Sequence, residues 1–227
     1  MGLSFRDLRA DEIECRVQQV GNSPKGVYAI LLLYKNARAD MTILDETVGQ
    51  LNWQRNHKRD NANCVVSIWD ADKVQWVEKE DTGTESFTEA EKGLASDSFK
   101  RACTNWGIGR ELYTSPFIYI EAEGKDGTNF ETYDKNGKPQ AKADFSVIDV
   151  VIKNKKIVGL TIMNLRNGKV VFSFGESSFQ KCENCGEPIV PVKKRDGTLW
   201  ESADMVAYST HAFKKALCSK CMKGAQK

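Results

Sequence analysis

The stretch TEAEKGLASDSFKRACTNWG, residues 88–107, contains the clearest helix signal of the sequence. Thr88 and Glu91 have the spacing of a capping box, in which two side chains satisfy backbone N–H groups at a helix start. Apolar residues then follow at helical spacing, namely Ala90, Leu94, Phe99, Ala102 and Trp106. Gly107 suits the left-handed residue that ends many helices. The stretch predicts one long amphipathic helix over residues 88–106.

Strand patterns surround this helix on both sides. They predict strands at residues 15–20, 27–34, 52–58, 64–70, 74–80, 117–122, 145–152, 157–164 and 170–174. Shorter helices are expected at residues 4–13, 38–48 and 203–217, and a polar loop at residues 124–143. The sequence therefore predicts an α+β protein, an antiparallel β-sheet packed against one long helix. We expect one domain over residues 1–175 and a small zinc-ribbon-like module over residues 180–227.

The composition restricts the class of protein. The chain has 227 residues, of which 41% are hydrophobic and 28% charged, an ordinary globular composition. Its longest apolar run, residues 28–34, is far shorter than the ~20 residues of a membrane-spanning helix. The N-terminus lacks the apolar centre of a signal peptide, which favours a cytoplasmic protein. The sequence contains no phosphate-binding G-x-x-x-x-G-K-[ST] loop, so chemistry that needs ATP is not expected.

Positive charge is concentrated near the C-terminus. Residues 181–227 contain nine Lys and Arg and five Asp and Glu, whereas the rest of the chain contains 24 basic and 26 acidic residues. The whole chain has a formal net charge of only +2. A nucleic-acid-binding role would therefore depend on local clusters of cations, against the plain alternative of a mixed solvated surface.

Four of the seven cysteines form two C-x-x-C pairs, Cys182 with Cys185 and Cys218 with Cys221. Two such pairs supply the four thiolates of a tetrahedral zinc site. Four protein ligands leave no open position, so one structural Zn²⁺ is expected. Two disulfides are the alternative, which the expected reducing compartment disfavours. His211 is a weak candidate to replace one thiolate.

Two groups of cations are candidates for binding an anion. Lys100 and Arg101 are adjacent on the predicted helix, although Asp97 and Arg101 also have the i,i+4 spacing of an ordinary helical salt bridge. Arg55, Lys58 and Arg59 follow Trp53, together with His57. Aromatic rings interleaved with cations are typical of single-strand binding grooves, in which cations hold phosphates and rings stack on bases. A soluble hairpin loop has the same composition.

Enzymatic signals are sparse. Glu123 and Lys125 match the E-x-K half of a metal-dependent nuclease site, for which Asp70 or Asp72 could supply another carboxylate. Such a short match arises often by chance. No cysteine has the partner histidine of a nucleophile. We therefore expect a protein without a catalytic residue.

Residues 93–113, GLASDSFKRACTNWGIGRELY, resemble the phage single-strand DNA annealing proteins of the Rad-fifty-two superfamily, in particular Sak-type recombinases. The eukaryotic branch has D-G-L-K-R-A-L-R-S-F-G where residues 97–107 read DSFKRACTNWG, in register without a gap. Residues 49–53, GQLNW, are similar to the G-x-N-x-W of the family. The order of the predicted elements is also similar, over about residues 5–165.

The resemblance implies a role for individual residues. In the family, a paired Lys-Arg lines the groove of an oligomeric ring and contacts the phosphates of single-stranded DNA, a role that falls on Lys100 and Arg101. A basic residue before the short helix contributes to the groove, and Arg38 is the nearest match. A family tyrosine is absent, since Gln50 and Leu51 stand in its place. The eukaryotic branch has no counterpart of the zinc module.

The resemblance implies a phage-encoded protein of the host cytoplasm that acts in homologous recombination and DNA repair. It would form a homo-oligomeric ring or filament, hold single-stranded DNA and anneal complementary strands without ATP. The DNA-binding residues would be Lys100, Arg101, Arg38, Arg55, Lys58 and Arg59. A single-strand-binding protein is a candidate partner. A metal-dependent nuclease and a zinc-ribbon adaptor without DNA activity remain the alternatives.

Overall fold

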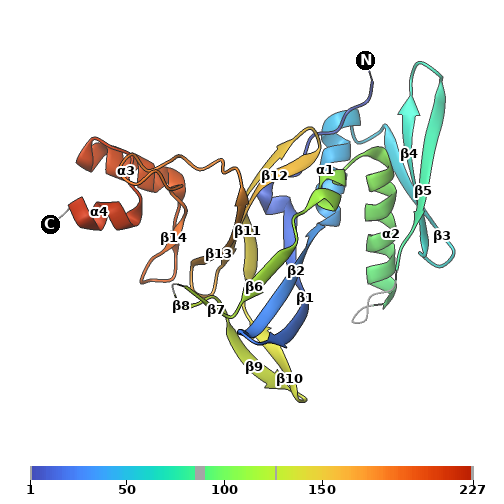
Figure 1. Cartoon of the computed structure of the whole chain (residues 1–227). Coiled ribbons are helices and arrows are strands. Elements are labelled where there is room, and N and C mark those ends of the chain that lie inside the picture. The colour runs from blue at the N-terminus through green and yellow to red at the C-terminus, as the bar shows by residue number, and fades with distance from the viewer. Residues whose placement is uncertain (1, 85–89, 126, 226–227) are drawn as a thin grey trace. The chain divides into compact units, whose positions relative to one another are not determined.

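The computed structural model describes residues 2–84, 90–125 and 127–225 (Figure 1). This part of the chain is α+β with antiparallel sheets, which confirms the predicted fold class. Its α-helices are α1 (Ala37–Val48), α2 (Ala90–Trp106), α3 (Ser202–Phe213) and α4 (Ser219–Ala225). Thr88, and with it the predicted capping box, lies outside the described residues.

The chain divides into two compact units. The first unit comprises Met1–Glu14, Leu33–Ser115 and Asn154–Lys156. The second comprises Cys15–Leu32, Pro116–Lys153 and Ile157–Lys227. The C-terminal module thus belongs to the same unit as most of the strands that precede it. The predicted limits, 1–175 and 180–227, follow the chain order, whereas these units are built from separate stretches of it.

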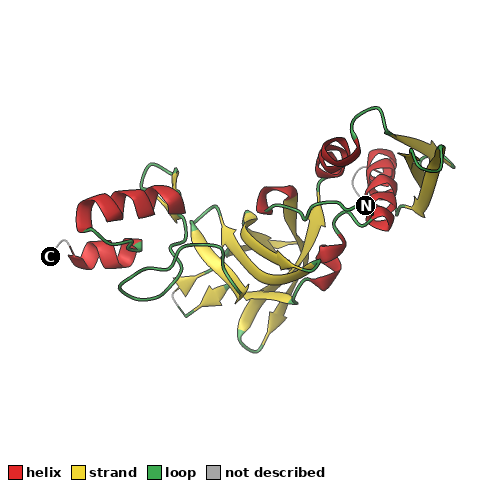
Figure 2. Cartoon of the chain, turned by 90° about the horizontal axis from the view of Figure 1, so that it is seen from above, coloured by secondary structure: helices red, strands yellow, loops and turns green. Residues whose placement is uncertain are grey.

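The first unit contains a three-stranded meander of β3 (Trp53–Lys58), β4 (Asn63–Asp70) and β5 (Gln75–Thr82), as the sequence predicts. Helix α2 packs on β4 and β5, and the Trp106 indole N–H donates to the Val66 carbonyl at 3.0 Å. Phe99 of α2 is fully buried, and its ring stacks on Trp53 with a centroid distance of 6.2 Å. Figure 2 shows α2 and this sheet as two adjacent layers.

Helix α1 begins and ends where its sequence dictates. The Asn36 side chain accepts a hydrogen bond from the backbone N–H of Arg38, which is an N-cap of the usual kind. At the other end, Gly49 takes a φ of 84° that a residue with a side chain rarely adopts. Ile43 and Leu44 are fully buried, and α1 contacts both α2 and β3.

The helix predicted at residues 4–13 is wrong. Only a single 3₁₀ turn, Ala10–Glu12, forms there. The backbone N–H of Leu8 donates to the buried Glu111 carboxylate at 2.8 Å, and the backbone N–H of Arg9 donates to Glu12 at 2.8 Å. The Glu111 carboxylate takes a backbone donor that a helix through Leu8 would have used, whereas the Glu12 carboxylate caps the 3₁₀ turn, so the residues before the turn stay without helix.

The second unit contains a six-stranded sheet in the order β13-β12-β11-β1-β2-β6. Its strands are β1 (Ile13–Ser23), β2 (Gly26–Lys35), β6 (Ile118–Glu121), β11 (Phe145–Lys153), β12 (Lys156–Asn164) and β13 (Lys169–Gly175). The edge strands β6 and β13 contact each other, so the sheet curls until its two edges meet. Paired residues such as Leu31 and Ile118 are buried on one face, whereas their neighbours Ile30 and Tyr119 are more exposed on the other.

The polar loop predicted at residues 124–143 is wrong as well, because it contains two hairpins. They are formed by β7 (Glu123–Gly124) with β8 (Gly127–Thr128) and by β9 (Glu131–Lys135) with β10 (Lys138–Lys142). Asn136 and Gly137 join β9 to β10 with φ values of 55° and 73°. An Asn-Gly pair with positive φ at both residues makes the two-residue turn that matches strand twist.

The C-terminal module follows a linker that is fastened to the sheet. The buried Asp149 carboxylate of β11 accepts hydrogen bonds from the Ser177 hydroxyl and from the Ser178 backbone at 2.9 Å. The module adds β14 (Val192–Lys193), β15 (Leu199–Trp200), α3 and α4. The helix predicted over residues 203–217 is shorter, because Lys214 takes a left-handed conformation and ends α3. Helix α4 was not predicted.

Candidate metal centre and nucleic-acid interface

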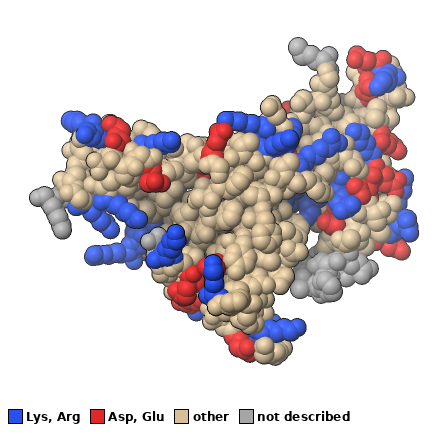
Figure 3. Space-filling model, viewed as in Figure 1, with Lys and Arg blue, Asp and Glu red and all other residues tan. Residues whose placement is uncertain are grey.

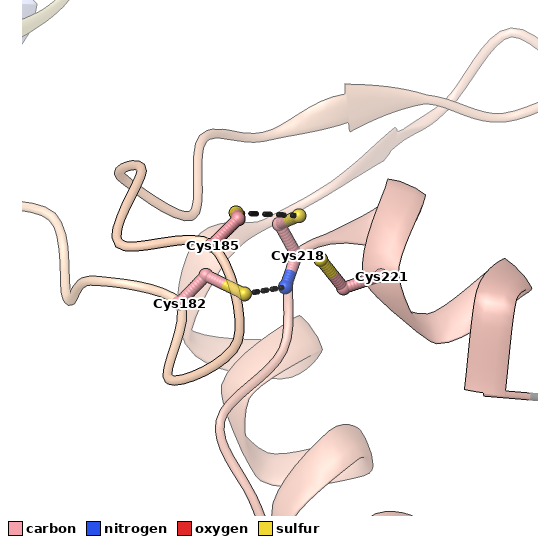
Figure 4. A group of neighbouring side chains, drawn as sticks. All are labelled: Cys182, Cys185, Cys218 and Cys221. Atoms are coloured by element: carbon pink, nitrogen blue, oxygen red, sulfur yellow. Dashed lines mark hydrogen bonds between the residues drawn. The ribbon is translucent and has the colours of Figure 1, made fainter.

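Four cysteines of the C-terminal module gather at one point (Figure 4). Cys182 and Cys185 come from the loop between Lys181 and Pro188, which are joined by an isolated β-bridge. Cys218 lies immediately before α4, and Cys221 lies on its first turn. The sulfur atoms all lie within 4.8 Å of one another. The predicted cluster is therefore present, and these thiols could hold a metal ion.

Hydrogen bonds hold the two cysteine pairs next to each other. The Glu183 N–H donates to the Ala216 carbonyl at 2.9 Å, and the Ala216 N–H donates back to the Glu183 carboxylate at 2.7 Å. The Cys218 N–H donates to the Cys182 sulfur at 3.3 Å. The stretch before the second pair is thereby attached to the first pair independently of any ion.

The electrostatics of the cluster favour a thiolate at Cys182, whereas hydrogen bonds among the thiols raise the pKa of Cys185 to about 12 and also raise that of Cys221. Burial alone would raise the pKa of the Cys182 thiol, but the backbone N–H groups of Cys218, Cys185 and Asn184 outweigh it and lower that pKa to about 6. The Asn184 amide also donates to the Cys221 sulfur at 3.3 Å. Thiolates are the form that binds metal ions. His211 lies on α3 and is not a member of the cluster.

The six cations predicted to bind DNA all belong to the first unit. Arg38 lies in the first turn of α1 rather than before it, Arg55 and Lys58 lie on β3, and Lys100 and Arg101 lie on α2. Arg59 lies in the turn after β3, with a φ of 51°. These cations therefore lie on different elements of the first unit, and each has its own neighbours.

Lys100 and Arg101 point to different neighbours. The Arg101 Nε is 3.3 Å from the Asp81 carboxylate of β5. Asp97, the partner that helical spacing suggested, instead accepts hydrogen bonds from the backbone and hydroxyl of Thr84. Lys100 is half-buried, and its charge acts on Asp40 of α1, where it opposes the burial that raises the pKa of that carboxyl. Each cation of the pair thus has a carboxylate of its own chain nearby.

Arg55 lies against the same helix. Its guanidinium carbon is 5.1 Å from the centre of the Phe99 ring, next to the turn that carries Lys100. His57 shares this face of β3, and burial together with the charge of Arg55 lowers its pKa. By strand alternation Lys58 lies on the opposite face of the sheet, where its ammonium is 3.6 Å from Glu80 of β5. The structure therefore separates Lys58 from Arg55.

A buried ion pair beneath these cations was missed by sequence reasoning. The Lys35 ammonium lies 2.6 Å from the Asp40 carboxylate and donates to the Ile108 carbonyl at 2.8 Å. Asp40 is fully buried and Lys35 is 6% exposed. Burial raises the pKa of Asp40 to about 6, against the lowering effect of Lys35. A lysine at the end of the apolar stretch YAILLLYK was the available signal.

The carboxylates of the nuclease alternative are engaged in local contacts. Asp70, in the first unit, accepts hydrogen bonds from the backbone of Asp72 and Lys73 and pairs with the Lys73 ammonium at 2.9 Å. Glu123, in the second unit, accepts a hydrogen bond from the Thr128 hydroxyl at 3.0 Å. In the described part of the chain, the cysteine cluster is the one group of Cys, His, Asp and Glu with the geometry of a metal site.

Comparison with known proteins leaves the chain without a match: no family model, no curated protein and no solved structure is significantly similar to it. None of the described helices combines the length and apolar character that crossing a membrane requires.

Proposed function

We propose that this protein binds single-stranded DNA through cations of the first unit and anneals complementary strands without ATP. It would act in phage recombination and DNA repair as a homo-oligomer, with a single-strand-binding protein as a candidate partner. The host cytoplasm is its proposed location. Base pairing supplies the free energy of such a reaction, so no catalytic residue is needed.

The observation that carries this proposal is the placement of four cations around the two packed helices. Lys100 and Arg101 lie on α2, Arg55 lies over Phe99 of the same helix, and Arg38 is exposed on α1. In the described residues Arg38 and Arg55 have no carboxylate at ion-pair distance. The resemblance of residues 97–107 to the annealing family supports the same helix independently.

The ion pair of Arg101 does not oppose this role. Its side chain is 46% exposed, and an exposed pair contributes only about 0–1 kcal/mol. A DNA phosphate can therefore displace Asp81 at little cost. Each phosphate contact releases counterions, so the logarithm of the binding constant should fall with the logarithm of salt concentration by about 0.7 per contact.

The test is strand annealing without ATP or magnesium. Two complementary oligonucleotides, one carrying a dye, are mixed with the wild type or with Lys100→Ala/Arg101→Ala. We expect the wild type to accelerate pairing and the variant to lose about tenfold or more of that acceleration. The matched control is Lys135→Ala/Lys138→Ala, which removes two exposed charges from the β9–β10 hairpin. Wild-type annealing by the α2 variant, with circular dichroism unchanged, would reject the assignment.

We also propose that the cysteine cluster holds one structural Zn²⁺. Four thiolates in tetrahedral array are the usual ligands of structural zinc. Metal analysis of protein purified without added metal should find one zinc per chain. Cobalt substitution should give the absorption bands of tetrahedral thiolate coordination. Iron in place of zinc, or substantially less than one ion per chain, would contradict this identity.

A further inference from the structure

The strongest unexplained surface lies on the second half of the C-terminal module. From Met205 to the end of the chain the sequence contains five lysines and no aspartate or glutamate. The module's acidic residues precede this stretch and include Glu201 and Asp204, at the start of α3. In the fold the exposed Glu183 lies beside this stretch, since its carboxylate accepts the Ala216 N–H, but no described lysine of the stretch forms an ion pair with an acid.

The described lysines of this surface have no carboxylate at ion-pair distance. Lys215, Lys220 and Lys223 are exposed, and the Lys214 ammonium donates only to the His211 carbonyl at 3.3 Å. Lys220 and Lys223 are three residues apart on α4, while the residues between them, Cys221 and Met222, are turned toward the module's interior. Figure 3 shows Lys and Arg side chains predominating over this module in the view drawn.

An exposed aromatic ring lies on α3, the helix that Lys214 ends. Tyr208 of α3 is 48% exposed and lies outside the small core of the module. Its ring is held edge-on by Trp200 at 5.5 Å and by Phe213 at 6.5 Å between centroids. Phe213 directly precedes Lys214. A ring supported in this way loses little freedom when a nucleic-acid base stacks on it.

We infer that α3, α4 and the second cysteine pair form a second binding surface for single-stranded DNA, distinct from the cations of the first unit. Lys215, Lys220 and Lys223 would hold phosphates, and Tyr208 would stack on a base. Cys218 lies between Lys215 and Lys220, and Cys221 lies between Lys220 and Lys223, so the bound metal would organise the surface. The inference therefore makes part of the DNA affinity dependent on the metal.

The lysines could instead balance the charge of the metal site, and an experiment can distinguish this role from DNA binding. A divalent ion with four thiolates carries a net charge of −2, which nearby ammonium groups would balance. Under that reading, removal of Lys220 and Lys223 weakens metal binding and leaves the DNA affinity of the metal-loaded protein unchanged. Metal content is therefore measured for every variant.

The experiment measures the affinity of the full-length, metal-loaded chain for a dye-labelled oligothymidine of about 30 nucleotides over a range of salt concentrations. We expect Lys220→Ala/Lys223→Ala to raise Kd about tenfold at low salt and to reduce the salt slope by about 1.4, or 0.7 for each lost contact. Lys135→Ala/Lys138→Ala removes the same charge elsewhere and should change neither value. Tyr208→Ala should raise Kd about fivefold or more. Tyr133→Ala, at a comparably exposed ring on β9, should leave Kd unchanged.

Chelation of the metal should remove the same share of affinity, after which the Lys220→Ala/Lys223→Ala change has no further effect. Three outcomes would each overturn the inference. They are an equal loss of DNA affinity in Lys220→Ala/Lys223→Ala and Lys135→Ala/Lys138→Ala, an unchanged Kd in Lys220→Ala/Lys223→Ala, and loss of metal from that variant. Lys220→Ala/Lys223→Ala is also introduced into the Lys100→Ala/Arg101→Ala variant, so that the contribution of each surface to the affinity can be measured separately. If only the proposed annealing site is wrong, Lys100→Ala/Arg101→Ala binds normally and the α4 variant still loses affinity.

Discussion

The two parts of this molecule that contain the candidate sites differ in the partners of their basic side chains. Around α2 the basic side chains contact other groups of the fold. Arg101 pairs with Asp81, Arg55 lies over a buried ring, and Lys35 forms a buried ion pair with Asp40. On α4, Lys220 and Lys223 have no such partner among the described residues. A cation in a packed layer must be paired or cover a ring, whereas one on a small module can remain free.

The two regions also differ in what holds them together. The layer of α2 and β3–β5 contains large, fully buried side chains such as Phe99. The core of the C-terminal module consists of six buried residues, which are Cys182, Ile189, Met205, Ala216, Leu217 and Met222. A core of this size contributes little stability, so small domains of this kind depend on metals or disulfides. We therefore expect the first region to fold by hydrophobic burial and the module to fold with its metal.

Metal removal should have the largest effect. Chelation, or Cys218→Ser/Cys221→Ser, should unfold α3 and α4, because metal binding contributes about 10–16 kcal/mol in comparable small domains. Hydrogen exchange should then show rapid exchange of the amides of α3 and α4 and unchanged protection of α2. Cys15→Ser, outside the cluster, is the control. Retained protection of α3 after complete metal removal would show that hydrophobic packing alone supports the module.

Truncation of a fully buried ring in the other region should have the next largest effect. Phe99→Ala should lower the free energy of unfolding by about 3–5 kcal/mol, since it removes a fully buried ring and leaves a cavity beside Trp53. Urea unfolding followed by tryptophan fluorescence measures this loss. Tyr113→Ala, at a ring that is 75% exposed, should change stability by less than about 0.5 kcal/mol. A loss at Phe99 as small as this would mean that the α2 layer is not the stable region.

The buried carboxylate should give the smallest effect, visible in the dependence of stability on pH. Because the pKa of Asp40 is raised to about 6 in the folded protein, the folded state keeps a proton that the unfolded chain has lost between about pH 4 and pH 6. Through this group, stability should fall as the pH rises across that window, by up to about 1.4 kcal/mol per pH unit.

Urea unfolding at several pH values checks this, with Asp40→Asn as the variant that loses the slope. Asp11→Asn, at an exposed carboxylate, is the control and should keep it. An identical slope in the wild type and in Asp40→Asn would show that Asp40 titrates near its ordinary pKa. The folded protein would then not raise the pKa of Asp40.

Local patterns were sufficient where a residue's role depends on its near neighbours. The spacing of Leu94, Phe99 and Trp106 predicted α2, and alternation predicted the meander of β3, β4 and β5. Residues 4–13 were misread because their backbone donors bond to side chains, among them that of Glu111, about a hundred residues away. The hairpin of β9 and β10 was missed although Asn136-Gly137 is a strong turn signal, since its strands are polar and bury little.

Helical periodicity and C-x-x-C spacing act over a few residues, so the α+β class, the long helix and the clustering of the four cysteines were predictable from the sequence alone. The partner of each cation, by contrast, depends on tertiary packing. Arg101 turns to Asp81 rather than Asp97, and Lys35 becomes buried against Asp40. Asp81 lies 20 residues from Arg101, and Lys35, although only five residues from Asp40, is buried in packing that includes the Ile108 carbonyl, 73 residues away, which no local pattern encodes. The free lysines of α4 are likewise recognised only once their surroundings are known.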